Sequence, residues 1–103
     1  MKVNLKKIML SLEGEPIKIG DRDLTLGDVI KLALQGRAET DRDGWDQKLR
    51  RIDLAEKVHN AADTVELTAE QIILIKQWVG TMFSARVCGQ VRDEIDPADK
   101  KIK

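Results

Sequence analysis

The segment that begins at Thr68 constrains the fold of this chain more than any other. Thr68 and Gln71 have the spacing of a capping box, which predicts that a helix starts here. From Ile72 onward, apolar side chains cover nearly the whole helix circumference except a strip around Lys76 and Gln77. Such a helix cannot face water on all sides. We therefore predict a central, largely buried helix, the third of three main helices.

The end of this helix is less sharply marked than its start. Gly80 and Gly89 are both weak helix formers, so a kink or a break between them is expected. Pro97 stops the helical pattern at Asp96. The apolar residues near the expected break are predicted to form either core or a protein interface, and the sequence leaves both roles open: Trp78, Val79, Met82, Phe83 and Val87.

The first 20 residues show the alternation of β-strands. The parity of the apolar positions changes at Lys6-Lys7, from Val3 and Leu5 to Ile8, Leu10 and Leu12, which calls for a bulge or a break. Residues 13–16 form a turn pattern, and Ile17–Ile19 a short return strand, so a β-hairpin is predicted. A hairpin alone is only marginally stable, and Thr64–Leu67 is a candidate third strand.

Two further helices are predicted between these parts. Thr25 and Asp28 have the arrangement that caps the first, and Gly36 ends it. Residues 37–44 are polar and are predicted to form a mobile loop. The second helix spans about 45–61 with an apolar stripe of Trp45, Leu49, Ile52, Ala55 and Val58, and Leu54 beside it. The predicted fold is one α+β domain over residues 1–96, an N-terminal β-hairpin followed by three main helices, with a frayed basic tail at 97–103.

Composition excludes several broad classes. Eighteen basic and 18 acidic residues give zero net charge, which provides no overall field for polyanions. Three aromatic residues are too few for a base-stacking platform. One cysteine cannot form a disulfide within the chain, and neither a signal-peptide pattern nor a span of about 20 apolar residues is present. A cytoplasmic protein without a membrane partner is expected.

Side chains for chemistry are scarce. His59 is the only histidine, and Cys88 stands alone without metal-ligand spacing, so neither a zinc site nor a nucleophilic dyad is indicated. Acidic residues around the hairpin, such as Glu13 and Asp21, read as solvated turn residues. The glycines match no phosphate-binding motif. We predict no enzymatic activity, no catalytic or metal site, no cofactor and no small-molecule substrate.

A nucleic-acid regulator is the alternative hypothesis. A local basic patch on the second helix could supply its contacts, with one arginine from further along the chain: Lys48, Arg50, Arg51 and Arg86. Acidic residues are interleaved with this patch, and the helix after Thr68 begins without positive charge, which weakens a helix-turn-helix interpretation.

Several segments spread over nearly the whole chain resemble a group of small proteins encoded by tailed bacteriophages and prophages. They are Met1–Leu5, Leu12–Pro16, Leu24–Val29, Arg51–Lys57, Val65–Ile72 and Val87–Val91. That group has no settled activity, so the resemblance implies a phage setting in a bacterial host cell and carries no functional residue. The leading hypothesis is a non-enzymatic protein-interaction module of phage or prophage origin that binds itself, as a homo-oligomer, or a host or phage protein.

Overall fold

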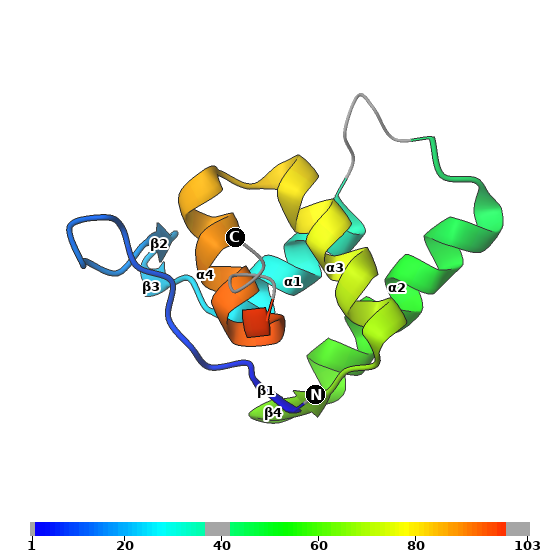
Figure 1. Cartoon of the computed structure of the whole chain (residues 1–103), viewed down its shortest axis with the longest axis horizontal. Helices are drawn as coiled ribbons and strands as arrows, with labels where there is room; N and C mark the ends of the chain where they lie inside the picture. The colour runs from blue at the N-terminus through cyan, green and yellow to red at the C-terminus, as the bar shows by residue number, and fades with distance from the viewer. Residues whose placement is uncertain (1, 37–41, 99–103) are drawn as a thin grey trace.

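The computed structural model of the chain describes residues 2–36 and 42–98, and these parts form an α+β fold (Figure 1). Four helices and four short strands lie within them. In chain order they are β1 (Lys2–Asn4), β2 (Lys18–Ile19), β3 (Arg22–Asp23), α1 (Leu26–Gln35), α2 (Trp45–Asn60), β4 (Thr64–Glu66), α3 (Ala69–Met82) and α4 (Ala85–Ile95). Most of the predicted mobile loop (residues 37–41) lies outside the described residues. Most of the predicted tail (residues 99–103) does so as well.

An N-terminal two-stranded hairpin is confirmed: β2 lies within the predicted return strand, but its hairpin partner is β3 and not the first segment of the chain. β2 and β3 pair antiparallel across a two-residue turn, with Ile19 opposite Arg22. Gly20 has a φ of 63° at the first turn position, which glycine adopts without steric cost. The predicted turn near Gly14 is present, with Leu10 bridging to Pro16, and the segment before it lies beside the hairpin.

The register of the first residues also differs from the prediction. The strand breaks after β1, as the parity change required. However, the side chain that points into the core beyond the break is Met9, which is fully buried, whereas Leu12 is 82% exposed. Met9 is held in this orientation because its N–H donates to the carbonyl of Leu24 and its own carbonyl accepts from Ile17.

The candidate third strand is present as β4, and it pairs with β1. β4 pairs antiparallel with β1, and Val3 lies opposite Val65, both buried. This second small sheet joins the N-terminus of the chain to the connection between α2 and α3 (Figure 1). The β1–β4 pair is therefore a separate sheet and does not extend the β2–β3 hairpin.

Both predicted capping boxes are confirmed. The Thr25 and Thr68 side chains each accept a hydrogen bond from the backbone N–H three residues on, and Asp28 and Gln71 bond back to the cap residues. The start of α1 has further partners, because the N–H groups of Leu26 and Gly27 donate to carbonyls of the preceding segment. A helix leaves its first N–H groups without partners inside the helix. In α1 these groups are satisfied by the Thr25 side chain and by the preceding segment.

The third predicted helix is two helices. α3 ends at Met82, and Ser84 accepts a hydrogen bond from the N–H of Val87 to start α4. The break lies between Gly80 and Gly89, as predicted, although each glycine is inside a helix. α4 then folds back against α3, so the chain after Thr68 forms a helical hairpin (Figure 1).

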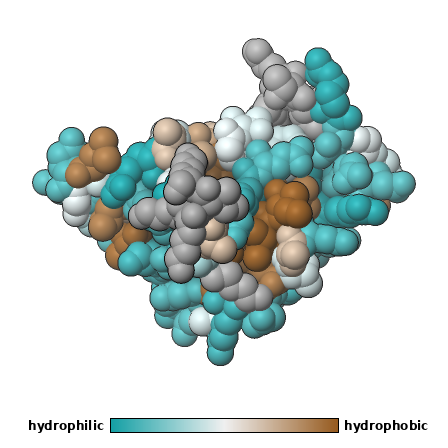
Figure 2. All heavy atoms as spheres, in the orientation of Figure 1, coloured by the Kyte–Doolittle hydropathy of each residue, from teal (hydrophilic) through white to brown (hydrophobic). Residues whose placement is uncertain are grey.

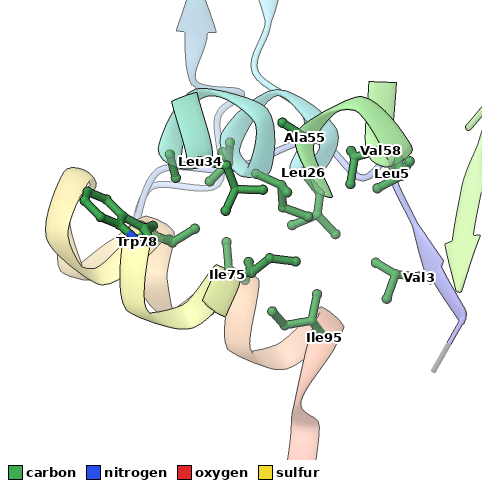
Figure 3. Close-up of a cluster of buried hydrophobic side chains, with 14 of the residues drawn as sticks. Val3, Leu5, Leu26, Leu34, Ala55, Val58, Ile75, Trp78 and Ile95 are labelled. Atoms are coloured by element: carbon green, nitrogen blue, oxygen red, sulfur yellow. The ribbon is translucent and has the colours of Figure 1, made fainter. Parts of the chain in front are cut away.

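The central helix is α1, and the prediction of a largely buried α3 is wrong. Seven of the ten α1 residues are buried, compared with three of the fourteen in α3. α1 packs against both α2 and α3, whereas α3 packs against α1 and α4 and leaves Ile73 and Met82 exposed. Figure 3 shows the result: Leu26 and Leu34 of α1 point toward Ile75 and Trp78 of α3 and Val58 of α2.

Candidate protein-interaction surface

The apolar stripe predicted for α2 reaches the surface of the molecule. Trp45 is 76% exposed and Leu49 40% exposed, and Ile52 is half-buried. The three residues lie four and three positions apart and so share one face of the helix; we call them the α2 stripe. Trp45 and Leu49, two members of the predicted apolar stripe, therefore lie outside the core. The residues that do face the core are Leu54, Ala55 and Val58.

Arg51 explains this orientation of α2. Its side chain is only 4% exposed, and its Nε and Nη2 donate to the carbonyls of Leu34 and Gly36 at 3.0 and 2.6 Å. The guanidinium carbon lies 3.6 Å from the centroid of the Trp78 ring, within range of a cation–π interaction. Nη1 is 3.4 Å from a carboxylate oxygen of Asp43. These contacts hold the Arg51 side of α2 against the end of α1, so the opposite side faces water.

Sequence reasoning missed the role of Arg51, although one signal was present. Arg51, Leu54, Ala55 and Val58 form an i, i+3, i+4, i+7 pattern that is as regular as the α2 stripe. From the sequence, Arg51 is assigned to a basic patch on the surface of the helix. The guanidinium is instead placed where three acceptors and an aromatic ring meet.

A groove of about 390 Å³ adjoins the α2 stripe. It lies between the β2–β3 hairpin, α1 and α2, and Ile52 belongs both to its wall and to the stripe. Leu32 of α1, 43% exposed, adds apolar surface to the same wall. The charged lining residues balance in sign: Arg22 and Lys31 against Asp28 and Glu56. The groove thus extends the apolar surface and gives it a polar border.

The ion pair between Arg22 and Asp28 in this border is bidentate. Nη1 and Nη2 of Arg22 donate to the two carboxylate oxygens of Asp28 at 2.7 and 3.2 Å, and the N–H of Thr25 donates to the same carboxylate at 3.1 Å. Burial alone would raise the pKa of Asp28, but the hydrogen bonds from Arg22 and Thr25 outweigh it and hold this pKa below its ordinary value. The ionised form of Asp28 is therefore favoured by folding.

The lowered pKa of Asp28 predicts a pH dependence of stability. As pH falls, the unfolded chain takes up a proton at Asp28 before the folded chain does, so acid favours unfolding. The contribution is complete above the ordinary pKa of aspartate, about 4, and is lost as pH falls through the lower folded pKa. We expect Asp28→Asn to be less stable than the wild type at pH 7, with the difference shrinking toward pH 3. Urea unfolding across this range measures it, and a constant difference would contradict the prediction.

A second apolar surface lies between α2 and α3, on the face shown in Figure 2. The groove there has a volume of about 560 Å³, with Leu54 and Leu74 in its lining and Ile73, 65% exposed, at its side. Its rim carries charges of both signs: Arg50, Lys57, Asp53 and Glu70. Lys57 also donates to Gln71 across the groove at 3.1 Å, which ties the two helices together.

The residues predicted as core or interface differ in their exposure. Trp78, Val79 and Val87 are at most 4% exposed and belong to the hydrophobic core of the single chain. Met82 is 36% exposed and Phe83 half-buried, at the break between α3 and α4. Of the five residues, Met82 and Phe83 alone are accessible enough to contact a partner, and their role in an interface stays a prediction.

The four basic residues of the nucleic-acid hypothesis are not brought together. Lys48 and Arg50 are exposed on α2, whereas Arg51 is buried against Trp78. Arg86 on α4 donates to the carbonyls of Leu10 and Ser11, so its guanidinium is already engaged. Nucleic-acid binding stays a prediction, and the arrangement of these side chains adds nothing to it.

His59 and Cys88, the two residues considered for metal binding or nucleophilic chemistry, belong to no cluster of metal-binding side chains among the described residues. His59 is exposed in the last turn of α2, 3.5 Å from the Nζ of Lys31. Cys88 is half-buried, with its sulfur 3.6 Å from the carbonyl oxygen of Val79. Over residues 2–36 and 42–98, no group of three or more His, Cys, Asp or Glu side chains is placed to hold a metal ion. Within the same ranges, no helix combines the length and the apolar character needed to cross a membrane.

Comparison with models of known protein families, with curated proteins and with solved structures finds no match to this chain. The case for a function therefore depends on the surfaces described above, chiefly the α2 stripe and the groove beside it.

Proposed function

We propose that this protein is a non-enzymatic protein-interaction module, of phage or prophage origin, that binds a protein through the α2 stripe. The phage setting depends on the resemblance of its segments to small phage-encoded proteins. The binding role depends on one observation above all. Trp45, the largest side-chain type, is 76% exposed at the start of a helix whose next two turns present Leu49 and Ile52 on the same side.

The arrangement of the stripe supports binding more than chance exposure does. Single apolar residues are common on protein surfaces and need no explanation. Here three follow one another at helical spacing and continue into a groove lined by Leu32. Tryptophan is also the residue type most enriched among those that carry binding energy at protein interfaces. A helix with one apolar stripe is a common way of presenting such anchors.

The matching of charge around the stripe supports a protein ligand. The groove at its end carries Arg22 and Lys31 beside Asp28 and Glu56, so it has no excess of either sign. A polyanion gains little from such a balanced border. A protein surface, with apolar side chains inside a polar rim, fits it better.

Co-purification tests this proposal. Tagged full-length chain would be expressed with untagged chain in host cells carrying the related phage or prophage. A variant with Trp45→Ser and Leu49→Ser removes the stripe, and Ile73→Ser is the matched control at the other apolar surface. We expect a bound protein, including the untagged copy, that the control retains and the stripe variant loses by about tenfold or more, since one buried tryptophan contributes about 2 kcal/mol or more. Equal retention by all three baits, or no protein specifically bound to any, would contradict the proposal.

A further inference from the structure

The spacing of the α2 stripe is that of a coiled-coil seam. Trp45, Leu49 and Ile52 are separated by four and three residues, and Glu56 and His59 continue the series. This alternation of four and three places residues along the line where two helices meet. The first three positions are apolar and the next two polar, so an apolar seam is available only over the first two turns of α2.

The charges beside the seam have a definite pattern. Lys48 directly precedes Leu49, and Asp53 directly follows Ile52, so they border the seam on opposite sides and stand five residues apart. In a parallel pair of helices, these are the two flanking positions that meet between chains. Both side chains are exposed, and neither makes an ion pair with any part of the chain that the structure describes. Two unpaired charges of opposite sign thus stand ready for a partner with the same pattern.

We infer that the partner of the α2 stripe is a second copy of this chain, bound parallel about a two-fold axis. This inference rests on the proposed function and specifies its partner. A two-fold axis along the seam places Lys48 of each copy next to Asp53 of the other, which makes two equivalent ion pairs. The antiparallel alternative sets like flanks together, Lys48 near Lys48 and Asp53 near Asp53, and is disfavoured by repulsion.

Glu56 limits the extent of the contact. It occupies the next seam position, where a continued parallel contact would bring two carboxylates together. The two helices therefore diverge after Ile52, and the interface is confined to the Trp45, Leu49 and Ile52 side chains with their flanking charges. An interface of this size belongs to the weak, reversible class of protein association.

Sedimentation equilibrium of the full-length chain tests the inference. The average mass is expected to rise from that of the 11.6 kDa monomer toward twice this value as concentration increases from micromolar to millimolar. Lys48→Glu alone and Asp53→Lys alone each replace attraction by repulsion and should weaken association about tenfold. The two changes in one chain recreate both ion pairs with reversed sign and should restore association to within about threefold of the wild type. Circular dichroism establishes that every variant keeps its helix content.

The outcomes separate this inference from the proposed function. A wild type that stays monomeric at millimolar concentration overturns the second copy as partner, while a different protein lost from the Trp45→Ser, Leu49→Ser bait would still support the α2 stripe as a binding surface. A dimer that neither single charge change weakens, or that the double change fails to restore, overturns the parallel arrangement. A dimer that follows the charge pattern supports both.

Discussion

Replacing Arg51 by alanine is expected to lower the free energy of unfolding by about 3–4 kcal/mol. The substitution removes a buried guanidinium that donates to the carbonyls of Leu34 and Gly36 and lies against the ring of Trp78. Hydrogen bonds from a charged donor contribute about 1.5–3 kcal/mol each. The two carbonyls lie at the C-terminal end of α1, where backbone carbonyls have no hydrogen-bond donor within the helix.

The reason for so large an effect is that the acceptors cannot be removed with the donor. A buried ion pair between two side chains can often be replaced by apolar residues at little cost. Here the partners include backbone carbonyls, which stay in place in every variant. Lysine is also a poor replacement, because its ammonium group lacks the planar fork that reaches both carbonyls and stacks on the Trp78 ring. We expect Arg51→Lys to recover less than half of the loss.

Urea unfolding followed by circular dichroism measures this effect. Arg50→Ala is the matched control, since Arg50 is the neighbouring arginine and is exposed on the same helix. Its free energy of unfolding should stay within about 0.5 kcal/mol of the wild type. If Arg51→Ala costs less than about 1 kcal/mol, the orientation of α2 described here is wrong, and with it the exposure of the α2 stripe.

Ile75→Ala is expected to destabilise the protein by about 3–4 kcal/mol, whereas Ile73→Ala should change stability by less than about 1 kcal/mol. Both residues lie in α3, two positions apart, and differ mainly in their surroundings. Ile75 is fully buried beneath α1, and Ile73 is 65% exposed beside the α2–α3 groove. Truncating Ile75 leaves a cavity lined by residues that point toward it from several elements, as Figure 3 shows.

The comparison also tests which side of α3 faces the core. Thermal unfolding by calorimetry gives both differences under the same conditions. Because alanine is a better helix former than isoleucine, helix propensity favours both variants slightly and cancels between them. Similar losses from the two changes would mean that α3 is buried all round, as its composition alone suggested, and would contradict its half-covered position.

Local features of this fold were predictable from the chain. The starts of α1 and α3 depend on hydrogen bonds between Thr25 and Asp28 and between Thr68 and Gln71, partners three residues apart. The end before Pro97 is likewise set by the backbone preferences of neighbouring residues, whereas the interruption between Gly80 and Gly89 falls at Ser84, which caps α4. The strand at Thr64–Glu66 was recognised as a strand, but local patterns did not specify its partner β1, which is about 60 residues away.

The candidate site could not be predicted in the same way. A period of 3.6 shows which side chains share a face of α2, but it does not show which of two faces turns inward. Trp45, Leu49 and Ile52 are apolar and regularly spaced, yet Trp45 and Leu49 are exposed. The acceptors that draw Arg51 inward lie at Leu34 and Gly36, and the ring at Trp78, all far from it along the chain.

The sequence by itself determined where α1 and α3 begin, because those points depend on hydrogen bonds within one turn. Only the tertiary structure decided which helix is central and which apolar face is left to water. α1 packs against α2 and α3 and is mostly buried, whereas α3, whose apolar side chains are spread more evenly around the helix, keeps Ile73 and Met82 exposed. The physical reason is that burial depends on what packs against a face, and those partners are brought together only when distant segments fold.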